Sequence, residues 1–113
     1  MNNPDSTAPE SPNNEARQSG KQDSAVRALS LGQIVATANA ISELPNAEML
    51  QALARHCAGD WGDVCEDDRQ ANEYALANGE RILSVYYTET GIKFWIITEW
   101  DRSITTILLP DDY

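Results

Sequence analysis

The only histidine of the chain, His56, stands among residue types that could bind a metal or transfer a proton. Its neighbours in the sequence include Cys57, Asp60, Asp63 and Cys65. Imidazole, thiolate and carboxylate groups are the usual zinc ligands, but His56 and Cys57 are adjacent and would point about 100° apart on a helix. No Cys-x-x-Cys pair is present either, so we expect neither a metal ion nor a cofactor. The structural interpretation makes Cys57 a small core residue and His56 a polar residue at a helix end.

The loop GDWGD, residues 59–63, is the most distinctive local motif. Its two glycines permit positive φ angles around a large indole, and its two aspartates can accept hydrogen bonds from backbone N–H groups. A catalytic interpretation pairs Asp60 or Asp63 with His56 as general acid and base of a small hydrolase. One histidine near carboxylates fits too many loops to identify an active site, so we assign no catalytic residue and do not expect an enzyme. The structural alternative places Trp61 as a plug between the helices and the sheet.

Acidic side chains dominate residues 60–80, where Arg69 is the only base and the balance is −6. Carboxylates three or four residues apart on a helix lie about 5 to 6 Å from one another, comparable to spacings along a nucleic-acid backbone. Such a surface could mimic DNA and occupy the basic groove of a protein that handles nucleic acid. The alternative is a solvated face that keeps the protein soluble. Calcium binding is a third option, but the sequence has no D-x-[DN]-x-[DN]-G loop. The acids are Asp60, Asp63, Glu66, Asp67, Asp68, Glu73 and Glu80.

The segment EWDRS, residues 99–103, offers a second kind of binding surface. Trp and Arg are the residues most enriched at binding hot spots, so an exposed Trp95 or Trp100 beside Arg102 would be a candidate anchor for a partner protein. Packing of at least one of these indoles in the core is the structural alternative, with Glu99 paired to Arg102 at the mouth of a turn. A surface ion pair of that kind contributes less than about 1 kcal/mol.

The overall charge excludes several classes of protein. The 113 residues carry 18 acidic and 8 basic side chains, for a formal net charge of −10. Direct binding to nucleic acid or to anionic lipid is not expected, because Lys and Arg supply much of the affinity in both cases. No apolar run approaches the roughly 18 to 20 residues that cross a bilayer, and the first residues lack the apolar centre of a signal peptide. We therefore expect a cytoplasmic protein with reduced cysteines.

Composition changes abruptly near residue 28. Residues 1–27 are rich in Asn, Ser, Asp and Gln and have few large apolar side chains, so they cannot offset a backbone entropy cost of roughly 1 to 2 kcal/mol per ordered residue. We predict a disordered tail there and a single small acidic domain over residues 28–113. That domain holds 14 acidic and five basic side chains, a balance of −9, so the acidity belongs to the folded part.

Two helices are predicted in the first half of this domain. The first covers residues 44–59, with Asn46 as its cap and Gly59 at its end, and the second covers residues 64–79. Residues 32–42 fit either a strand or the start of a helix. The apolar positions of the first helix are Leu50, Leu53, Ala54 and Cys57, and the thin stripe of the second is Ala71, Tyr74, Ala75 and Leu76.

From Arg81 onward the hydrophobic period changes to two. Three segments rich in β-branched and aromatic residues, 81–87, 92–98 and 103–109, are joined by short connections and predict three antiparallel strands. Their apolar face needs a cover, which the preceding helices can supply. The predicted fold class is α+β, with N-terminal helices packed on a C-terminal three-stranded antiparallel β-meander. The residues assigned to shared faces are Leu83, Val85 and Tyr87, and Ile92, Phe94 and Ile96, with Trp95 and Ile97 opposite.

Residues 31–113 resemble a family of small uncharacterised bacterial proteins, described as plasmid-related, that occur on plasmids, integrative elements and prophages. The resemblance lies in HCAGDWGDVCEDDRQANEYAL and in the run from GERILSVYY through WIITEWDRSITTILLP. It implies no catalytic residue. Small acidic proteins of mobile elements are often inhibitors of host defence, including anti-restriction and anti-CRISPR proteins, and some of these are DNA mimics. The resemblance therefore implies a protein that modulates a host defence or nucleic-acid-handling protein.

Residues and resemblance together predict a non-enzymatic protein that binds the basic surface of a nucleic-acid enzyme, as a monomer or a homodimer. A generic interaction module that uses the aromatic strands is the alternative, and a small hydrolase or metal protein at His56 is a third. The predicted partner-binding residues are Asp60, Trp61, Asp63, Glu66, Asp67, Asp68, Glu73, Trp95, Trp100 and Arg102.

Overall fold

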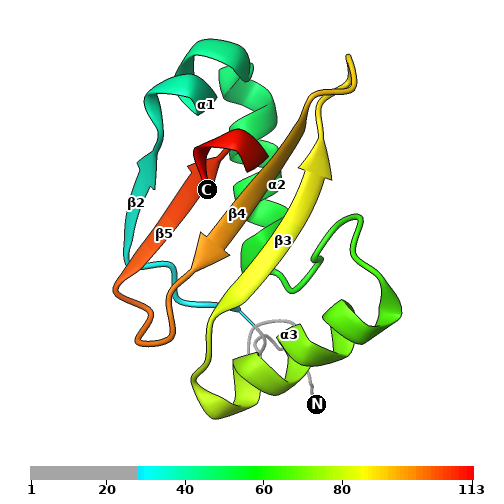
Figure 1. Cartoon of the computed structure of the whole chain (residues 1–113). Coiled ribbons are helices and arrows are strands. Elements are labelled where there is room, and N and C mark those ends of the chain that lie inside the picture. Colours follow the sequence, from blue (N-terminus) through cyan, green and yellow to red (C-terminus); the bar gives the residue numbers. More distant parts are fainter. Residues whose placement is uncertain (1–27) are drawn as a thin grey trace, which may run out of the picture.

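The computed structural model describes residues 28–113, which build one four-stranded sheet and the helices around it (Figure 1). The predicted disordered tail, residues 1–27, lies outside the described residues. In chain order the elements are β2 (Gln33–Ala36), α1 (Ala38–Glu43), α2 (Asn46–Cys57), α3 (Glu66–Asn78), β3 (Ile82–Tyr87), β4 (Lys93–Thr98), β5 (Ile104–Leu108) and the 3-10 helix η2 (Pro110–Asp112).

The α+β class is confirmed, but the prediction of a three-stranded antiparallel meander with all helices before it is wrong. Strands β3, β4 and β5 do pair antiparallel in sequence order. Strand β2 adds a fourth, parallel strand beside β5, so the order is β2-β5-β4-β3. Helices α1, α2 and α3 lie between the first and second strands of the chain, and η2 follows the last strand. A four-residue strand whose partner lies about 70 residues away leaves no local hydrophobic period to detect.

The segment of residues 32–42, which fitted either a strand or the start of a helix, contains both a strand and a helix start. Strand β2 occupies its first part, and α1 begins directly after Thr37. The Thr37 side-chain oxygen accepts a hydrogen bond from the backbone N–H of Ala40, which satisfies one of the donors that a helix start leaves unpaired. A single threonine therefore marks the change from strand to helix.

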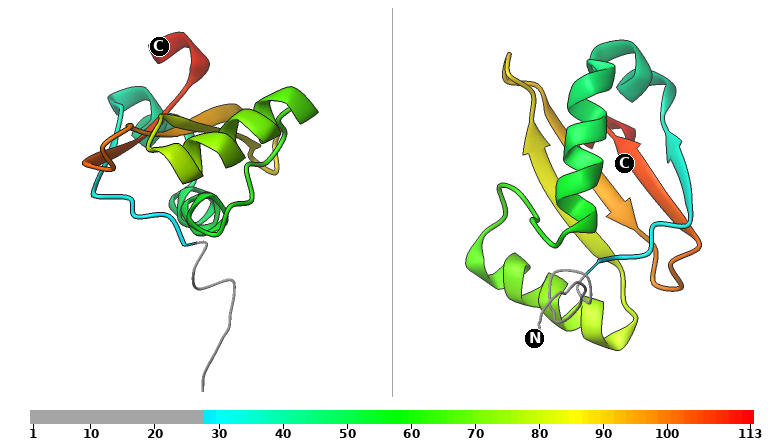
Figure 2. Two further views of the ribbon diagram at one scale, coloured as in Figure 1. Left: turned by 90° about the horizontal axis from the view of Figure 1, so that it is seen from below. Right: turned by 180° about the vertical axis from the view of Figure 1, so that it is seen from behind.

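Helix α2 covers one face of the sheet, and η2 lies on the opposite side (Figure 2). The predicted apolar stripe of α2 is wrong by one position, because Leu50 is 62% exposed. The residues that α2 buries do repeat with helical spacing, but the last of them is the histidine. They are Met49, Ala52, Leu53 and His56. A pattern that counts histidine as polar selects the neighbouring stripe.

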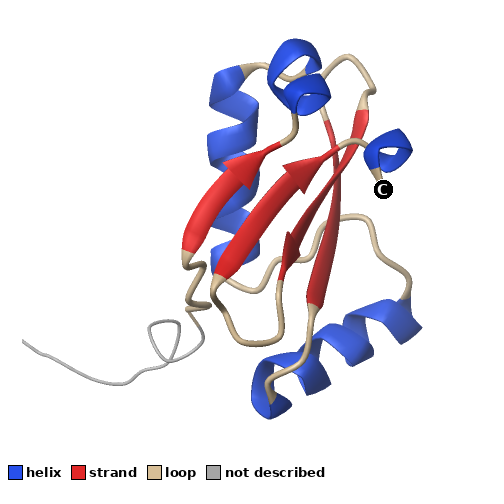
Figure 3. Ribbon diagram, turned by 60° about the vertical axis from the view of Figure 1, so that its left-hand side comes forward, coloured by secondary structure: helices blue, strands red, loops and turns tan. Residues whose placement is uncertain are grey.

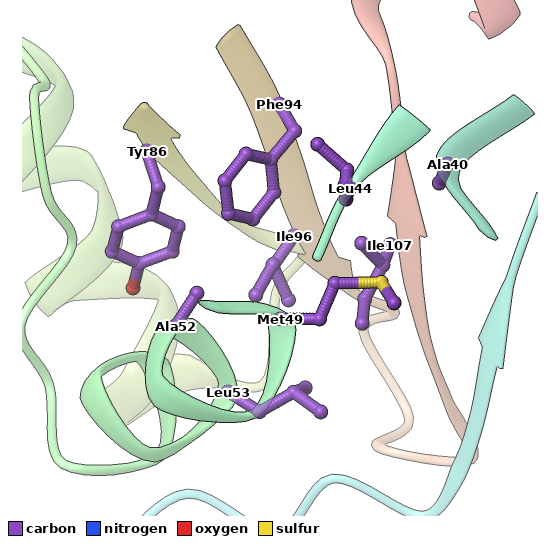
Figure 4. Packing of buried hydrophobic residues seen from close by; sticks show 9 residues of the cluster. All are labelled: Ala40, Leu44, Met49, Ala52, Leu53, Tyr86, Phe94, Ile96 and Ile107. Carbon is purple, nitrogen blue, oxygen red and sulfur yellow. The ribbon is translucent and has the colours of Figure 1, made fainter. Parts of the chain in front are cut away.

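The main core lies between α2 and the sheet (Figure 4). Tyr86 and Phe94 pack against each other, with ring centroids 5.8 Å apart, and Ile96 and Ile107 continue the same face across β4 and β5. Leu83, Val85 and Tyr87 share one face of β3 as predicted, but it is the less buried face, and Tyr87 is half exposed. The residues of β3 that face α2 are Ile82, Ser84 and Tyr86.

Helix α3 lies beyond one end of the sheet rather than over either face (Figure 3). Its predicted end is confirmed: Gly79 is the C-cap with a φ of 68°, and its N–H donates to the carbonyl of Ala75. Its predicted apolar stripe is partly right: Ala75 is buried and Leu76 packs against the second core cluster, but Tyr74 is 59% exposed. The residues that α3 buries are Asn72 and Ala75.

Candidate functional site

His56 is completely buried on the sheet-facing side of α2. Its Nδ1 lies 2.6 Å from Ser84 Oγ on β3, and its Nε2 lies 2.8 Å from Thr98 Oγ1 on β4. The prediction that His56 is a polar residue at the helix end and Cys57 the core residue is therefore reversed, because Cys57 is half-buried. Among the described residues, no group of three or more His, Cys, Asp or Glu side chains is placed to hold a metal ion.

The hydroxyl groups beyond His56 continue a chain of hydrogen bonds across the sheet. Thr98 Oγ1 lies 2.8 Å from Thr105 Oγ1, and Thr105 donates to the backbone oxygen of Leu31 at 2.7 Å. A carbonyl oxygen can only accept, so this last bond fixes the direction of those before it. Thr98 donates to Thr105, His56 donates from Nε2 to Thr98, and Ser84 donates to Nδ1. Neutral His56 therefore satisfies both ring nitrogens.

Burial, together with the positive charge of Arg102, lowers the pKa of His56 from 6.5 to about 4. An imidazole with that pKa is neutral at physiological pH. The imidazole contacts a hydroxyl group at each nitrogen and packs nearly perpendicular to the Trp61 ring, with centroids 5.8 Å apart. A general acid or base must reach a substrate, and this ring reaches only the interior of the protein.

The two aspartates that the hydrolase hypothesis pairs with His56 are used elsewhere. Asp60 forms a two-pronged ion pair with Arg55, with distances of 2.8 and 3.2 Å, and accepts from the Gly62 N–H. The Arg55 hydrogen bond lowers the pKa of Asp60. Asp63 is exposed, and its backbone N–H donates to the carbonyl of Val85. The structure therefore does not bring His56 together with either carboxylate.

The loop 59–63 places Trp61 between the helices and the sheet, as the structural alternative predicted. Trp61 is buried and joins Leu29, Ala75 and Ile82 in a second core cluster between α3 and the end of β3. Its indole N–H donates to Glu73 on α3 at 3.0 Å. Gly62 has a φ of +77°, and a Cβ built there would lie 2.0 Å from the carbonyl oxygen of Val85, so the close approach requires glycine.

A pocket of about 210 Å³ opens beside this loop. Asp60 and Glu73 line it together with Arg69, and the loop backbone and Trp61 form its wall. Arg55 already pairs with Asp60, and Trp61 with Glu73. The pocket thus belongs to the acidic part of the surface, yet its carboxylates act mainly within the protein.

The remaining acids among the predicted partner-binding residues divide into two kinds. Glu66 accepts from Arg69 and Gln70 one turn later, which lowers the pKa of Glu66 to about 2. Asp63, Asp67 and Asp68 are exposed, and none of them has a side-chain hydrogen bond or ion pair within residues 28–113. We define these three residues as the acidic surface. It spans the end of the loop and the first turn of α3, where carboxylates suit the positive end of the helix dipole.

Nearly all the cations of residues 28–113 are used within the protein. Arg55, Arg69 and Arg81 each pair with one carboxylate, from Asp60, Glu66 and Glu99 respectively. Arg102 instead donates to backbone carbonyl oxygens of Ala75, Glu80 and Glu99. Acidic side chains outnumber basic ones by nine over residues 28–113, so these cations can neutralise only a minority of the carboxylates.

The three residues predicted around the last turn play different roles. Trp95 is half-buried and packs edge-on against Tyr113, with ring centroids 5.7 Å apart. Trp100 is 65% exposed. The expected pair between Glu99 and Arg102 side chains does not form, because Arg102 holds the end of α3 through its carbonyls. Arg102 has a φ of 62°, an uncommon value that its three carbonyl contacts help to stabilise.

Sequence reasoning missed the polar residues that surround His56. Ser84, Thr98 and Thr105 are all fully buried, on three different strands. A usable signal was present: each occupies the α2-facing side of a strand that is otherwise apolar there. A hydroxyl on a buried strand face needs a partner, and the one histidine was available.

No helix of the described residues is long and apolar enough to span a membrane. Comparison with protein families, curated proteins and solved structures gives no match to this chain.

Proposed function

We propose that this chain is a non-enzymatic binding protein of the cytoplasm, whose acidic surface occupies a basic site on a protein that handles nucleic acid. The observation that carries the proposal is the state of Asp63, Asp67 and Asp68. They are exposed and have no cation beside them, while the neighbouring arginines are already paired. Desolvating a carboxylate is costly unless a partner supplies a positive charge, so a basic surface is the partner that this arrangement favours.

The acidic surface concentrates negative charge at the start of α3. Asp67 and Asp68 are consecutive on the first turn of α3, and Glu66 beside them stays ionised because its pKa is about 2. Negative groups spaced by a few ångströms attract the Lys and Arg side chains that normally contact a nucleic-acid backbone. An inhibitor of a restriction enzyme, a CRISPR nuclease or a related defence protein could act in this way, as the resemblance to mobile-element proteins implies.

The test replaces Asp63, Asp67 and Asp68 together by Asn and measures capture and inhibition of bacterial restriction and CRISPR nucleases at low and physiological salt. We expect the wild type to bind more weakly as salt rises, and the triple variant to lose inhibition. The matched control replaces Glu43, Glu89 and Asp111 by Gln, Gln and Asn, which removes the same charge from exposed positions elsewhere. A folded triple variant that inhibits as well as the wild type would overturn the proposal.

A second candidate function rests on Trp100. This indole is 65% exposed in the turn before β5. Burial of so large an apolar ring against a partner protein would favour binding. Trp95 contributes less to this alternative because Tyr113 already covers it. The alternative predicts that Trp100→Ala abolishes binding to a partner that the acid-to-amide variant still binds. The opposite pattern supports the acidic surface.

A further inference from the structure

The two edges of the sheet differ in how their backbone groups are paired. At the β3 edge, the Asn72 side chain donates to the carbonyl of Leu83 at 2.8 Å and accepts from its N–H at 3.2 Å. One step further, Val85 donates to the carbonyl of Trp61 and accepts from the N–H of Asp63. The outward-facing backbone groups at these positions of β3 are therefore satisfied within the protein.

The β2 edge has no such cover. Gln33 and Thr37 donate to backbone oxygens of β5 and its preceding loop, so the alternation of a strand turns the N–H and C=O groups of Ile34 and Ala36 away from the sheet. Among the described elements, β2 is the outermost strand of the sheet at this edge, and none lies beyond it in Figure 1. An open strand edge is a ready template for pairing with another strand.

Open edges are usually protected by charged residues or proline, and this one has neither. Residues 28–42 contain no charged side chain and no proline, although the domain as a whole carries a balance of −9. Ile34, in the middle of the open edge, is 48% exposed. Because like charges repel, this uncharged edge is the region where two copies of so acidic a domain can meet without opposing carboxylates.

We infer that β2 pairs antiparallel with β2 of a second copy, so that two four-stranded sheets join into one across a two-fold axis at Val35. In this register Ile34 and the partner's Ala36 form two backbone hydrogen bonds with each other. By symmetry, Ala36 and the partner's Ile34 form two more. The Ile34 side chain then packs beside the partner's Ala36, a small residue, on the face of the sheet that α2 covers. Val35 faces the partner's Val35 as a closely spaced pair without hydrogen bonds.

The contact is short, so the dimer forms in a concentration-dependent way rather than permanently. Sedimentation of the full chain should show a monomer of 12.5 kDa at low concentration and twice that mass at high concentration. Ile34→Lys adds the charge that edges normally carry and should weaken dimerisation about tenfold or more. The control is Leu50→Lys, the same charge change at an exposed apolar residue of α2, which should leave the dimer intact. A wild-type chain that stays monomeric up to about 1 mM overturns the inference.

A cross-linking experiment tests the register even if the dimer is weak. In a Cys57→Ala and Cys65→Ser background, Val35→Cys should form an intermolecular disulfide under mild oxidation, because the two residues face each other at about 4.5 Å between Cα atoms. Gln33→Cys is the matched control: its two copies would lie about 13 Å apart along the strands, too far for a disulfide. Equal cross-linking of both variants would indicate random collision and overturn the inferred pairing.

Discussion

His56, at the centre of a buried hydrogen-bond chain, and the acidic surface of Asp63, Asp67 and Asp68 are close in sequence, yet their polar atoms meet opposite environments. In the first, Ser84, His56 and Thr98 bond to one another inside the protein. In the second, the carboxylates face water. The residue types that look catalytic thus stabilise the fold, and ordinary aspartates remain available for a partner.

The physical reason for this difference is desolvation. A buried polar group costs free energy unless each donor and acceptor is paired, so the sheet supplies a hydroxyl for each nitrogen of His56. Ionised aspartates would cost far more to bury, and they stay at the surface. Variants that exchange these two environments test the comparison.

The largest effect is expected for His56→Ala. This change leaves a cavity beneath α2 and removes the partners of Ser84 and Thr98, so the free energy of unfolding should fall by about 4 kcal/mol. Urea denaturation at pH 7 measures it. Leu50→Ala, on the exposed side of the same helix, should change stability by less than about 1 kcal/mol. Equal losses in the two variants would mean that His56 is not a core residue.

The second effect is a dependence of stability on pH. The pKa of His56 is about 4 in the folded protein and near 6.5 when unfolded, so the unfolded chain binds more protons between these values. The stabilisation that depends on neutral His56 is fully present above pH 6.5. The free energy of unfolding should fall by about 3 kcal/mol as the pH drops from there toward 4. His56→Gln should lack this slope between pH 7 and 5, as measured by urea denaturation. A slope that persists in the variant would assign it to other groups.

A smaller effect is expected for Asn72→Ala on α3. Asn72 is the buried polar residue of the same helix that carries Asp67 and Asp68, and its amide satisfies both backbone groups of Leu83. Its loss should lower the free energy of unfolding by about 2 kcal/mol. Gln70→Ala, an exposed amide of the same helix, is the control and should have little effect. Protection of the Leu83 amide against hydrogen exchange should fall only in the Asn72 variant.

The smallest effect on stability is expected for the Asp63, Asp67 and Asp68 to Asn variant. Relief of repulsion among carboxylates offsets the lost interaction of Asp67 and Asp68 with the helix dipole, so the net change should stay within about 1 kcal/mol. Thermal unfolding at low and high salt measures it. A loss as large as that of His56→Ala would make these aspartates structural and would weaken the proposed function.

Much of the local structure was predictable from short-range patterns. The three antiparallel strands follow from period-two apolar residues, and α3 ends at Gly79 as its sequence indicates. The place of Trp61 between the helices and the sheet was also anticipated as the structural alternative. The strands and the end of α3 depend on residues that are near one another in the chain, so their spacing is visible in the sequence.

The candidate site was only partly predictable. The sequence shows the concentration of acids in residues 60–80, but it does not show that Asp60, Glu66 and Glu73 have partners while Asp67 and Asp68 do not. Arg55 and Arg69 are close in the chain to Asp60 and Glu66, but whether each ion pair forms depends on the side-chain rotamers of the folded protein. The expected Glu99 and Arg102 pair failed because the carbonyls at the end of α3 lie within reach of Arg102.

The sequence by itself determined the α+β class, the acidic balance of the domain and the local period of each strand, because composition and spacing are properties of the chain alone. The tertiary structure decided which side of α2 is buried and which strand neighbours β5. Both depend on contacts between distant residues: His56 becomes a core residue only when Ser84 and Thr98 reach it, and β2 becomes a strand only beside β5. Such pairings leave no local period, so only the folded chain reveals them.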